Sequence, residues 1–436
     1  MQIINNPNKN EWRQVLKRPT QTVGDIEATV IQIFDDVLKN GDAAIKTYTF
    51  KFDGILLDSN SVTPEEIQKA IKLVPEKLQN AIKNAKHNID VFHKAQKTSK
   101  IEVETTKGVQ CWQEKRAIQK VGLYIPGGTA PLFSTVLMLA VPAQIAGCKE
   151  IVLCSPPNKQ GELAPEILFA ANLCGVTKII KVGGIQAIAG LTFGTETIPQ
   201  VYKIFGPGNQ FVTVAKQLAT KHGVAIDMPA GPSELLVVAD ETANASYIAS
   251  DLLSQAEHGT DSQVILVSTS QTLIDEVSEA VEKQLNVLPR KAIAEKAIAN
   301  SKLIYVKTDE IALELINEYG PEHFIICSKS EAFYVNNIAN AGSVFIGDYT
   351  PESAGDYASG TNHTLPTNGF SKAYSGVNLD SFSKSMTFQK ISKEGILKIG
   401  ETIELMAEAE GLQAHKNAVT IRLKDLIPTK AGISKE

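Results

Sequence analysis

The stretch Val121-Gly-Leu-Tyr-Ile-Pro-Gly-Gly-Thr129 joins a short apolar run to a glycine-rich turn, and it begins the part of the chain that decides the fold. From here on, apolar runs of strand length alternate with segments long enough for helices. The predicted strands in this part are Val121–Ile125, Ile151–Cys154, Ile179–Val182 and Lys203–Phe205. Such alternation is typical of βαβ units, so the sequence predicts a mainly parallel sheet.

Glycines stand in the predicted turns after these strands, at Gly127–Gly128, Gly183–Gly184 and Gly206-Pro-Gly208. Parallel sheets bind ligands at the carboxyl ends of their strands, where glycine lets the backbone approach a phosphate. This placement is compatible with a dinucleotide. The Gly-x-Gly-x-x-Gly fingerprint is absent, however, because Phe211 stands where the third glycine would be, and the glycines alone favour tight turns.

A second half with the same rhythm follows, and it indicates an internal duplication without a residue-level repeat. Its predicted strands are Leu235–Ala239, Val264–Val267, Leu303–Val306, Phe324–Cys327 and Val344–Ile346. The first hundred residues are predicted to be mostly helical, with helices at Val23–Leu38 and Asp42–Phe50 and a capping box at Thr63-Pro-Glu-Glu66.

The two ends of the chain look too poor in apolar residues to fold alone. Residues 1–20 are predicted to form an arm with a short helix near Trp12–Leu16. Residues 376–436 are predicted to form a tail with a helix that ends at Glu410-Gly411 and a strand at Ala418–Leu423. Between them, we expect residues 21–120 and 234–375 to form one α/β domain and residues 121–233 to form another.

Composition narrows the class of partner. The chain has 436 residues, 43% of them hydrophobic, and a net charge of −5 without any block of Lys or Arg. This balance favours a small-molecule partner over nucleic acid or an anionic membrane surface. The N-terminus has no apolar signal core and Val136–Ala146 is too short to span a bilayer, so the predicted location is the cytoplasm.

Side chains from three distant segments carry the donors that zinc prefers. Gln255 and His258 stand three apart near the end of a predicted helix closed by Gly259, which places them on one helical face. The other donors are Asp356 and His363, in an irregular stretch at 347–375, and His415 beyond the tail helix. Each has an ordinary alternative as a helix end, a turn former or an exposed histidine. Together they could close a zinc site.

Glu322 and His323 are adjacent at the start of a predicted strand. They could serve as two proton-transfer groups, because their pKa values bracket neutral pH when burial raises that of the carboxyl. A surface acidic residue in a loop that begins at Pro321 explains the pair equally well on chemistry alone.

Seven motifs, in this order, resemble the motif series of the histidinol dehydrogenase family. They are VGLYIPGGTAP (121–131), GPGNQFVTVAK (206–216), AGPSE (230–234), SQAEHG (254–259), GPEH (320–323), SAGDYASGTNH (353–363) and EGLQAH (410–415). The resemblance extends from about residue 20 to residue 423. It implies two incomplete Rossmann-like parallel-sheet domains with a helical N-terminal region and a small C-terminal tail domain.

The resemblance implies an enzyme that oxidises L-histidinol to L-histidine in two hydride transfers to NAD, through a bound aldehyde, with one Zn²⁺ per subunit. It also implies a cytoplasmic homodimer whose tail reaches the partner's site, with residues 121–233 on the NAD side. The implied zinc ligands are Gln255, His258, Asp356 and His415. The implied substrate contacts are these four with Ser233, His323, His363 and Glu410, and the implied NAD contacts are Tyr124, Gln186 and Asn209.

Within this scheme His323 would take the hydroxyl proton as hydride leaves, and Glu322 would deprotonate the water that hydrates the aldehyde. The sequence also permits the two roles to be exchanged. A zinc hydrolase could use the same metal with Glu322 as base and no NAD, although the glycine-rich strand ends argue against it. A non-catalytic binding protein on the same fold would need neither Glu322 nor His323.

Overall fold

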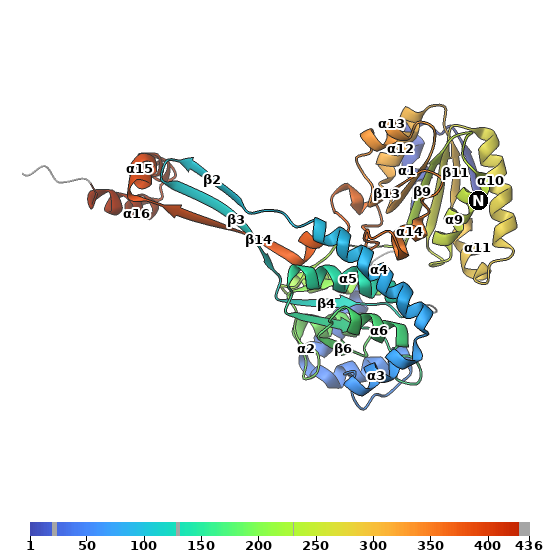
Figure 1. The fold of residues 1–436 in the computed structure, drawn as a ribbon, viewed down its shortest axis with the longest axis horizontal. Helices are drawn as coiled ribbons and strands as arrows, with labels where there is room; N and C mark the ends of the chain where they lie inside the picture. Colours follow the sequence, from blue (N-terminus) through green and yellow to red (C-terminus); the bar gives the residue numbers. More distant parts are fainter. Residues whose placement is uncertain (20–23, 128–130, 230, 427–436) are drawn as a thin grey trace, which may run out of the picture. The chain divides into compact units, whose positions relative to one another are not determined.

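The computed structural model describes residues 1–19, 24–127, 131–229 and 231–426. It forms two compact units. The first comprises Met1–Gln96 and Ile118–Phe382, and the second comprises Lys97–Ala117 and the chain from Ser383 onward. The first unit holds two parallel sheets and the second holds one antiparallel sheet (Figure 1). Two parts of the quoted motifs, residues 128–130 and residue 230, lie outside the described residues.

A five-stranded parallel sheet occupies the middle of the chain, in the strand order β6-β5-β4-β7-β8. Its strands are β4 (Lys120–Tyr124), β5 (Glu150–Cys154), β6 (Lys178–Ile180), β7 (Lys203–Phe205) and β8 (Ala225–Ile226). The first four overlap the predicted strands, although β6 ends two residues earlier than predicted. The chain runs from β4 outward to β6 and then returns to β7, so the strand order reverses between β4 and β7.

Helices cover both faces of this sheet (Figure 1). One face packs against α3 (Pro64–Leu73), α4 (Glu76–Ala95), α5 (Phe133–Ala146) and α6 (Pro165–Leu173), and the other against α2 (Gly24–Asp53), α7 (Gly184–Phe193) and α8 (Gln210–Lys221). The helices of the first hundred residues therefore belong with the sheet of residues 121–233, although the sequence predicts that they group with 234–375. Helical periodicity marks which face of a helix is apolar but not which sheet will cover it.

The second parallel sheet has six strands in the order β1-β11-β10-β9-β12-β13. Its strands are β1 (Gln2–Asn5), β9 (Glu234–Ala239), β10 (Gln263–Ser268), β11 (Lys302–Tyr305), β12 (His323–Cys327) and β13 (Ser343–Ile346). From β9 onward the chain repeats the order of the first sheet, which supports the predicted duplication at the level of topology. The arm adds β1 to the edge, beside β11.

Helices pack on both faces of the six-stranded sheet as well. One face carries α9 (Ala245–Ala256), α10 (Gln271–Leu285) and α11 (Lys291–Ala299), and the other carries α1 (Trp12–Val15), α12 (Asp309–Tyr319) and α13 (Glu331–Asn337). Trp12 and Leu16 of the arm are buried in the second of these cores. The predicted fold class, α/β with two Rossmann-like halves, is confirmed.

The second unit consists of a hairpin and the tail. Its sheet has the order β14-β3-β2, with β2 (Ile101–Thr106), β3 (Val109–Ala117) and β14 (Ser383–Ile391) all antiparallel. The tail continues with α15 (Lys393–Ala409) and α16 (Gln413–Lys424). The predicted strand at Ala418–Leu423 is therefore wrong. Val419 is buried and Leu423 lies against Gly400 of α15, and a spacing of four residues puts both on one helical face.

The break predicted between the helices at Val23–Leu38 and Asp42–Phe50 is present within α2, because Gly41 has non-helical backbone angles, with a φ of 51°. The irregular stretch at 347–375 contains a short helix, α14 (Glu352–Tyr357), and the 3-10 turn η2 (Phe370–Lys372). Within the described residues, no helix is both long and apolar enough to span a membrane.

Candidate active site

The candidate site is built around the amino ends of β9 and β12, the two adjacent strands at the reversal point of the six-stranded sheet. His323 is the first residue of β12 and pairs with Leu235 of β9, so Glu234 and Glu322 meet at the same edge. The main-chain N–H of Glu234 donates to Oε2 of Glu322 over 2.9 Å. The register of two parallel strands thus holds the predicted proton-transfer pair.

The imidazole of His323 is buried among polar groups. Its Nδ1 lies 3.1 Å from the carbonyl oxygen of Glu234, 3.6 Å from Oε2 of Glu322, 3.5 Å from Oε1 of Glu352 and 3.1 Å from the amide Nε2 of Gln255. Three of these four neighbours are acceptors, which favours the tautomer that carries its proton on Nδ1 and donates to the carbonyl. Nε2 is then an unprotonated lone pair, and it is buried without a hydrogen-bond partner. Burial lowers the pKa of His323 to about 4, which keeps the ring neutral at neutral pH.

Glu322 is buried beside this imidazole. Burial, foremost, and the neighbouring carboxyls of Glu234 and Asp356 raise its pKa well above the ordinary value, although the N–H of Glu234 opposes the shift. A carboxylate with a raised pKa is a stronger base, and such perturbed groups gather at functional sites. The adjacent pair therefore consists of a neutral imidazole with a free lone pair and a strongly basic carboxylate.

Donors suited to a metal meet at this edge. One ligand atom from each of His323, Glu352 and Asp356 lies within 4.8 Å of the others. Gln255, on α9, donates from Nε2 to the carbonyl of Glu234 over 3.2 Å, while its Oε1 is buried without a partner. An orphaned amide oxygen, carboxylates and an imidazole form a set of oxygen and nitrogen donors that fits zinc.

Glu352 is absent from the sequence-based prediction. It stands four residues before Asp356 on α14, and this i, i+4 spacing puts both carboxylates on one helical face. Its carboxylate is buried without a hydrogen-bond partner. Burial, foremost, then Asp356 and Glu322, raise its pKa well above the ordinary value. The spacing is visible in the sequence, but the segment is predicted to be irregular, which hides the shared face.

His258 lies close to Asp356, although not where the sequence predicts it. Helix α9 ends at Ala256, so Gln255 is helical while His258 lies in the following turn, its N–H 3.2 Å from the carbonyl of Gln255. The prediction that both stand on one helical face is wrong. The side chain of His258 is exposed, and its pKa is lowered because surrounding protein disfavours the charged ring, although the charge of Asp356 opposes this shift.

Of the other predicted substrate-contacting residues in the first unit, His363 adjoins the cluster. Nδ1 of His363 lies 3.5 Å from Oδ1 of Asp356, and its Nε2 lies 3.2 Å from Oγ1 of Thr135. Burial, the largest single influence, opposes ionisation of Asp356, but the hydrogen bond and charge of His363 together with the charges of His323 and His258 outweigh it and lower the pKa of the carboxyl. Ser233 is half-buried and directly precedes β9.

Glu410 and His415 belong to the second unit. Glu410 is the C-cap of α15 and His415 lies in α16, and both side chains are exposed.

The three predicted NAD contacts line one cavity of about 740 Å³ at the carboxyl ends of the five-stranded sheet. This volume is typical of small-molecule sites, and the position follows the rule for doubly wound sheets. The hydroxyl of Tyr124 accepts from the N–H of Gly184 over 3.1 Å, and burial raises its pKa to about 12. Gln186 is buried with neither side-chain polar atom paired, and Asn209 caps α8.

A buried ion pair holds the turn before Asn209. The ammonium of Lys216 contacts the carboxylate of Asp227 and donates to the carbonyl of Gly206 over 2.7 Å, while Asp227 accepts from the N–H of Gly206 over 2.8 Å. Gly206 has a φ of 124°, and an added Cβ would lie 2.1 Å from the carbonyl oxygen of Tyr124. Only glycine permits this approach, although the fingerprint motif is absent.

Comparison with known proteins identifies the family. Residues 16–423 match the family described as histidinol dehydrogenase. The chain belongs to the histidinol dehydrogenase family. It is 58% identical over 426 residues to the histidinol dehydrogenase of Bacteroides fragilis, covering 98% of this chain and all of that one. It is 53% identical over 419 residues to the enzyme of Vibrio cholerae, covering 95% and 96% of the two chains.

A crystal structure of histidinol dehydrogenase from Elizabethkingia anophelis superimposes with a TM-score of 0.95 at 54% identity, covering 98% of each chain. Membership of the histidinol dehydrogenase family makes this chain an oxidoreductase, as predicted. The fold and the family are thus consistent over nearly the whole length.

Proposed function

We propose that this chain oxidises L-histidinol to L-histidine, the end of histidine biosynthesis, by two successive hydride transfers to NAD through a bound aldehyde. One observation carries the proposal: His323 presents a buried, unpartnered Nε2 at a cluster of metal donors, in a chain of the histidinol dehydrogenase family. A neutral imidazole of this kind is suited to take a proton from an alcohol as hydride leaves.

Zinc fits the donor set. Gln255, His258 and Asp356 would hold the ion, with His415 from the tail of a second copy of the chain as the fourth ligand. When bound, zinc would grip the imidazole and amine of histidinol and orient its hydroxyl. Ser233, His323, His363 and Glu410 would make the remaining contacts to the substrate.

His323 would remove the hydroxyl proton in both oxidations. Its Nδ1–H is committed to the carbonyl of Glu234, so the proton arrives at Nε2 and the ring becomes a cation between the carboxyls of Glu322 and Glu352. These carboxyls stabilise the cation that forms. The same contacts return the ring to its neutral tautomer when the proton leaves.

Glu322 would act between the two oxidations. The aldehyde must take up water before a second hydride can leave, and a buried carboxylate with a raised pKa is a suitable base for that water. The N–H of Glu234 fixes the direction of the carboxylate through Oε2. The proposed water-activating group would then act beside the imidazole proposed to remove the alcohol proton.

NAD fits the cavity at the carboxyl ends of the five-stranded sheet. Its walls include glycine turns, Tyr124 and the unpaired amide of Gln186, and Asn209 stands at the start of α8. A helix N-terminus and glycine turns are suited to a pyrophosphate, and an unpaired buried amide needs a polar partner such as a ligand supplies. NAD, when bound, would accept the hydride.

The proposed assembly is a cytoplasmic homodimer with composite sites. Glu410 and His415 are exposed on a unit whose helices carry several exposed apolar side chains, among them Leu405, Met406 and Ile421. A two-fold partner would cover such a surface and receive the two polar residues in its site.

Mixing the purified protein with L-histidinol, NAD and zinc tests the function. Two molecules of reduced nicotinamide per histidinol are expected, with L-histidine as product. A zinc hydrolase would yield no reduced nicotinamide from any substrate, and a binding protein would retain histidinol unchanged. Either result, with zinc and NAD present, would overturn the proposal.

A further inference from the structure

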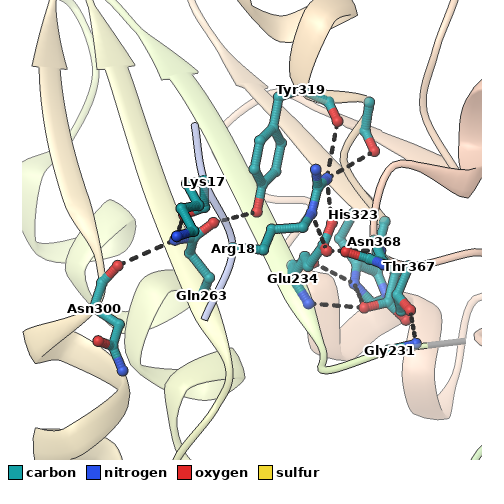
Figure 2. Close-up of polar contacts among 12 residues, drawn as sticks. Lys17, Arg18, Gly231, Glu234, Gln263, Asn300, Tyr319, His323, Thr367 and Asn368 are labelled. Carbon is teal, nitrogen blue, oxygen red and sulfur yellow. Dashed lines mark hydrogen bonds and ion pairs between the residues drawn. The ribbon is translucent and has the colours of Figure 1, made fainter. Parts of the chain in front are cut away.

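Arg18, at the end of the N-terminal arm, reaches the amino ends of β9 and β12, where the candidate site lies. Its Nε donates to Oε1 of Glu234 over 2.5 Å and its Nη2 donates to Oε2 over 2.9 Å. This is a two-pronged ion pair, and the side chains of Arg18 and Glu234 are only 15% and 2% exposed. Figure 2 shows the guanidinium between the carboxylate of Glu234 and Tyr319.

The arm that presents Arg18 is itself held rigidly. The guanidinium carbon lies 3.9 Å from the ring centroid of Tyr319, and Nη2 also donates to the carbonyl of Tyr319 over 2.9 Å. The Tyr319 hydroxyl donates to Gln263, whose amide donates to the carbonyl of Lys17 (Figure 2). Together with β1 on the sheet edge, these contacts fix the arm immediately before Arg18.

The main chain of Glu234 forms hydrogen bonds with three side chains of the candidate site. Its N–H binds Glu322, and its carbonyl accepts from both Gln255 and Nδ1 of His323. The carboxylate of the same residue is fixed by Arg18 and by the N–H of Asn368 over 2.7 Å. One residue therefore joins the arm to three side chains of the site.

We infer that Arg18 is a positioning residue, which through Glu234 holds His323 in its Nδ1–H tautomer and directs Glu322. The inference rests on the proposed roles of His323 and Glu322. A planar guanidinium can bind both carboxylate oxygens and stack on a ring at once, whereas a lysine ammonium can satisfy only one of these demands. Charge alone at position 18 is therefore insufficient.

The experiment compares Arg18→Lys and Arg18→Met with Arg13→Met, a control on the exposed face of α1 in the same arm. We expect kcat with histidinol to fall about 10- to 100-fold in both Arg18 variants, as small misplacements of catalytic groups do. The KM for NAD should stay within about twofold, because its cavity lies at the other sheet. Arg13→Met should match the wild type.

Two further measurements separate positioning from plain stability. Guanidinium ion added to Arg18→Ala should restore part of kcat, but it should restore nothing to His323→Asn. In metal-free protein labelled with ¹⁵N-histidine, the Nδ1–H signal of His323, assigned by its absence in His323→Asn, should be lost in Arg18→Met. The spectrum is a readout independent of turnover.

Unchanged kcat in Arg18→Lys, or an intact Nδ1–H signal in Arg18→Met, would overturn the inference. Loss of melting temperature and kcat in parallel, with no rescue by guanidinium, would likewise reduce Arg18 to a structural role and overturn it. If the wild type itself forms no reduced nicotinamide, the proposed function fails instead, while the histidine spectrum still tests what Arg18 does to the tautomer.

Discussion

Asp251 provides a quantitative test of how strongly burial raises the pKa of a carboxyl on α9, the helix that carries Gln255. It lies on α9, one turn before Gln255, and is buried at 9% exposure. Burial raises the pKa of its carboxyl from an ordinary value near 4 to about 7. The folded protein therefore binds a proton between pH 4 and pH 7 that the unfolded chain does not bind, and this group destabilises the fold as the pH rises through that window.

The substitution Asp251→Asn keeps the shape and removes the titration. A rise of the pKa from near 4 to about 7 destabilises the fold by roughly 4 kcal/mol at most, and this full destabilisation is reached at pH values above the folded pKa. About 1.5 kcal/mol of this destabilisation is already present at pH 5. The free energy of unfolding of Asp251→Asn relative to the wild type should therefore grow by roughly 2–3 kcal/mol between pH 5 and pH 8. In a unit of this size that is a gain in melting temperature of about 3 °C.

Calorimetry or fluorescence melting of wild type and Asp251→Asn at several pH values from 5 to 8.5 gives the answer. The difference in melting temperature should increase up to about pH 7 and level off above pH 8. Asp275→Asn, at an exposed position on α10, is the control for loss of a carboxylate. A pH-independent difference, or a variant less stable than the wild type at pH 8, would refute the reasoning.

Gly206→Ala forces a Cβ against the carbonyl of Tyr124, so the KM for NAD should rise at least tenfold or the yield of folded protein should collapse. The control Gly223→Ala has free space around the added Cβ, so it should lower the free energy of unfolding in urea by only about 1 kcal/mol. Asp356→Ala should copurify with little zinc yet keep its NAD affinity; a full zinc equivalent by metal analysis contradicts the ligand assignment. Glu322→Gln should retain slow oxidation of histidinol but lose far more activity on added histidinaldehyde, and equal losses would contradict the division of roles. Mixing the Glu322→Gln protein with a His415→Ala protein should restore activity once subunits exchange, and no recovery after verified exchange would show that the tail serves its own chain.

The strands and their turns were the most predictable part of the fold. The strand predicted at Val264–Val267 is β10, at Gln263–Ser268, and the strand predicted at Ile151–Cys154 is β5, at Glu150–Cys154. Strands buried on both faces are continuous apolar runs, which a sequence displays directly. The exposed strands β2 and β14 display no such run, because most of their side chains face solvent on a sheet that buries little, and they escaped prediction.

Some residues of the candidate site were predictable from the sequence and others were not. Motif resemblance selected Gln255, Asp356 and His323, and the structure brings these three to one edge of the six-stranded sheet. Resemblance did not select Glu352 or Arg18. Neither stands in a motif quoted for the family, and each is recognised only by what lies within hydrogen-bonding or ionic distance of its side chain.

The sequence by itself determined local features: where apolar runs form strands, where glycine permits a turn, and which side chains carry donors for zinc or protons. These depend on neighbours within a few positions along the chain. Tertiary structure alone decided that residues 18, 234, 255, 323 and 352 meet. Their meeting depends on the register of β9 against β12 and on an arm that adds a strand to a distant edge. Such long-range pairing costs chain entropy and is stabilised by burial and hydrogen bonds between distant segments, and neither contribution appears as a local sequence pattern.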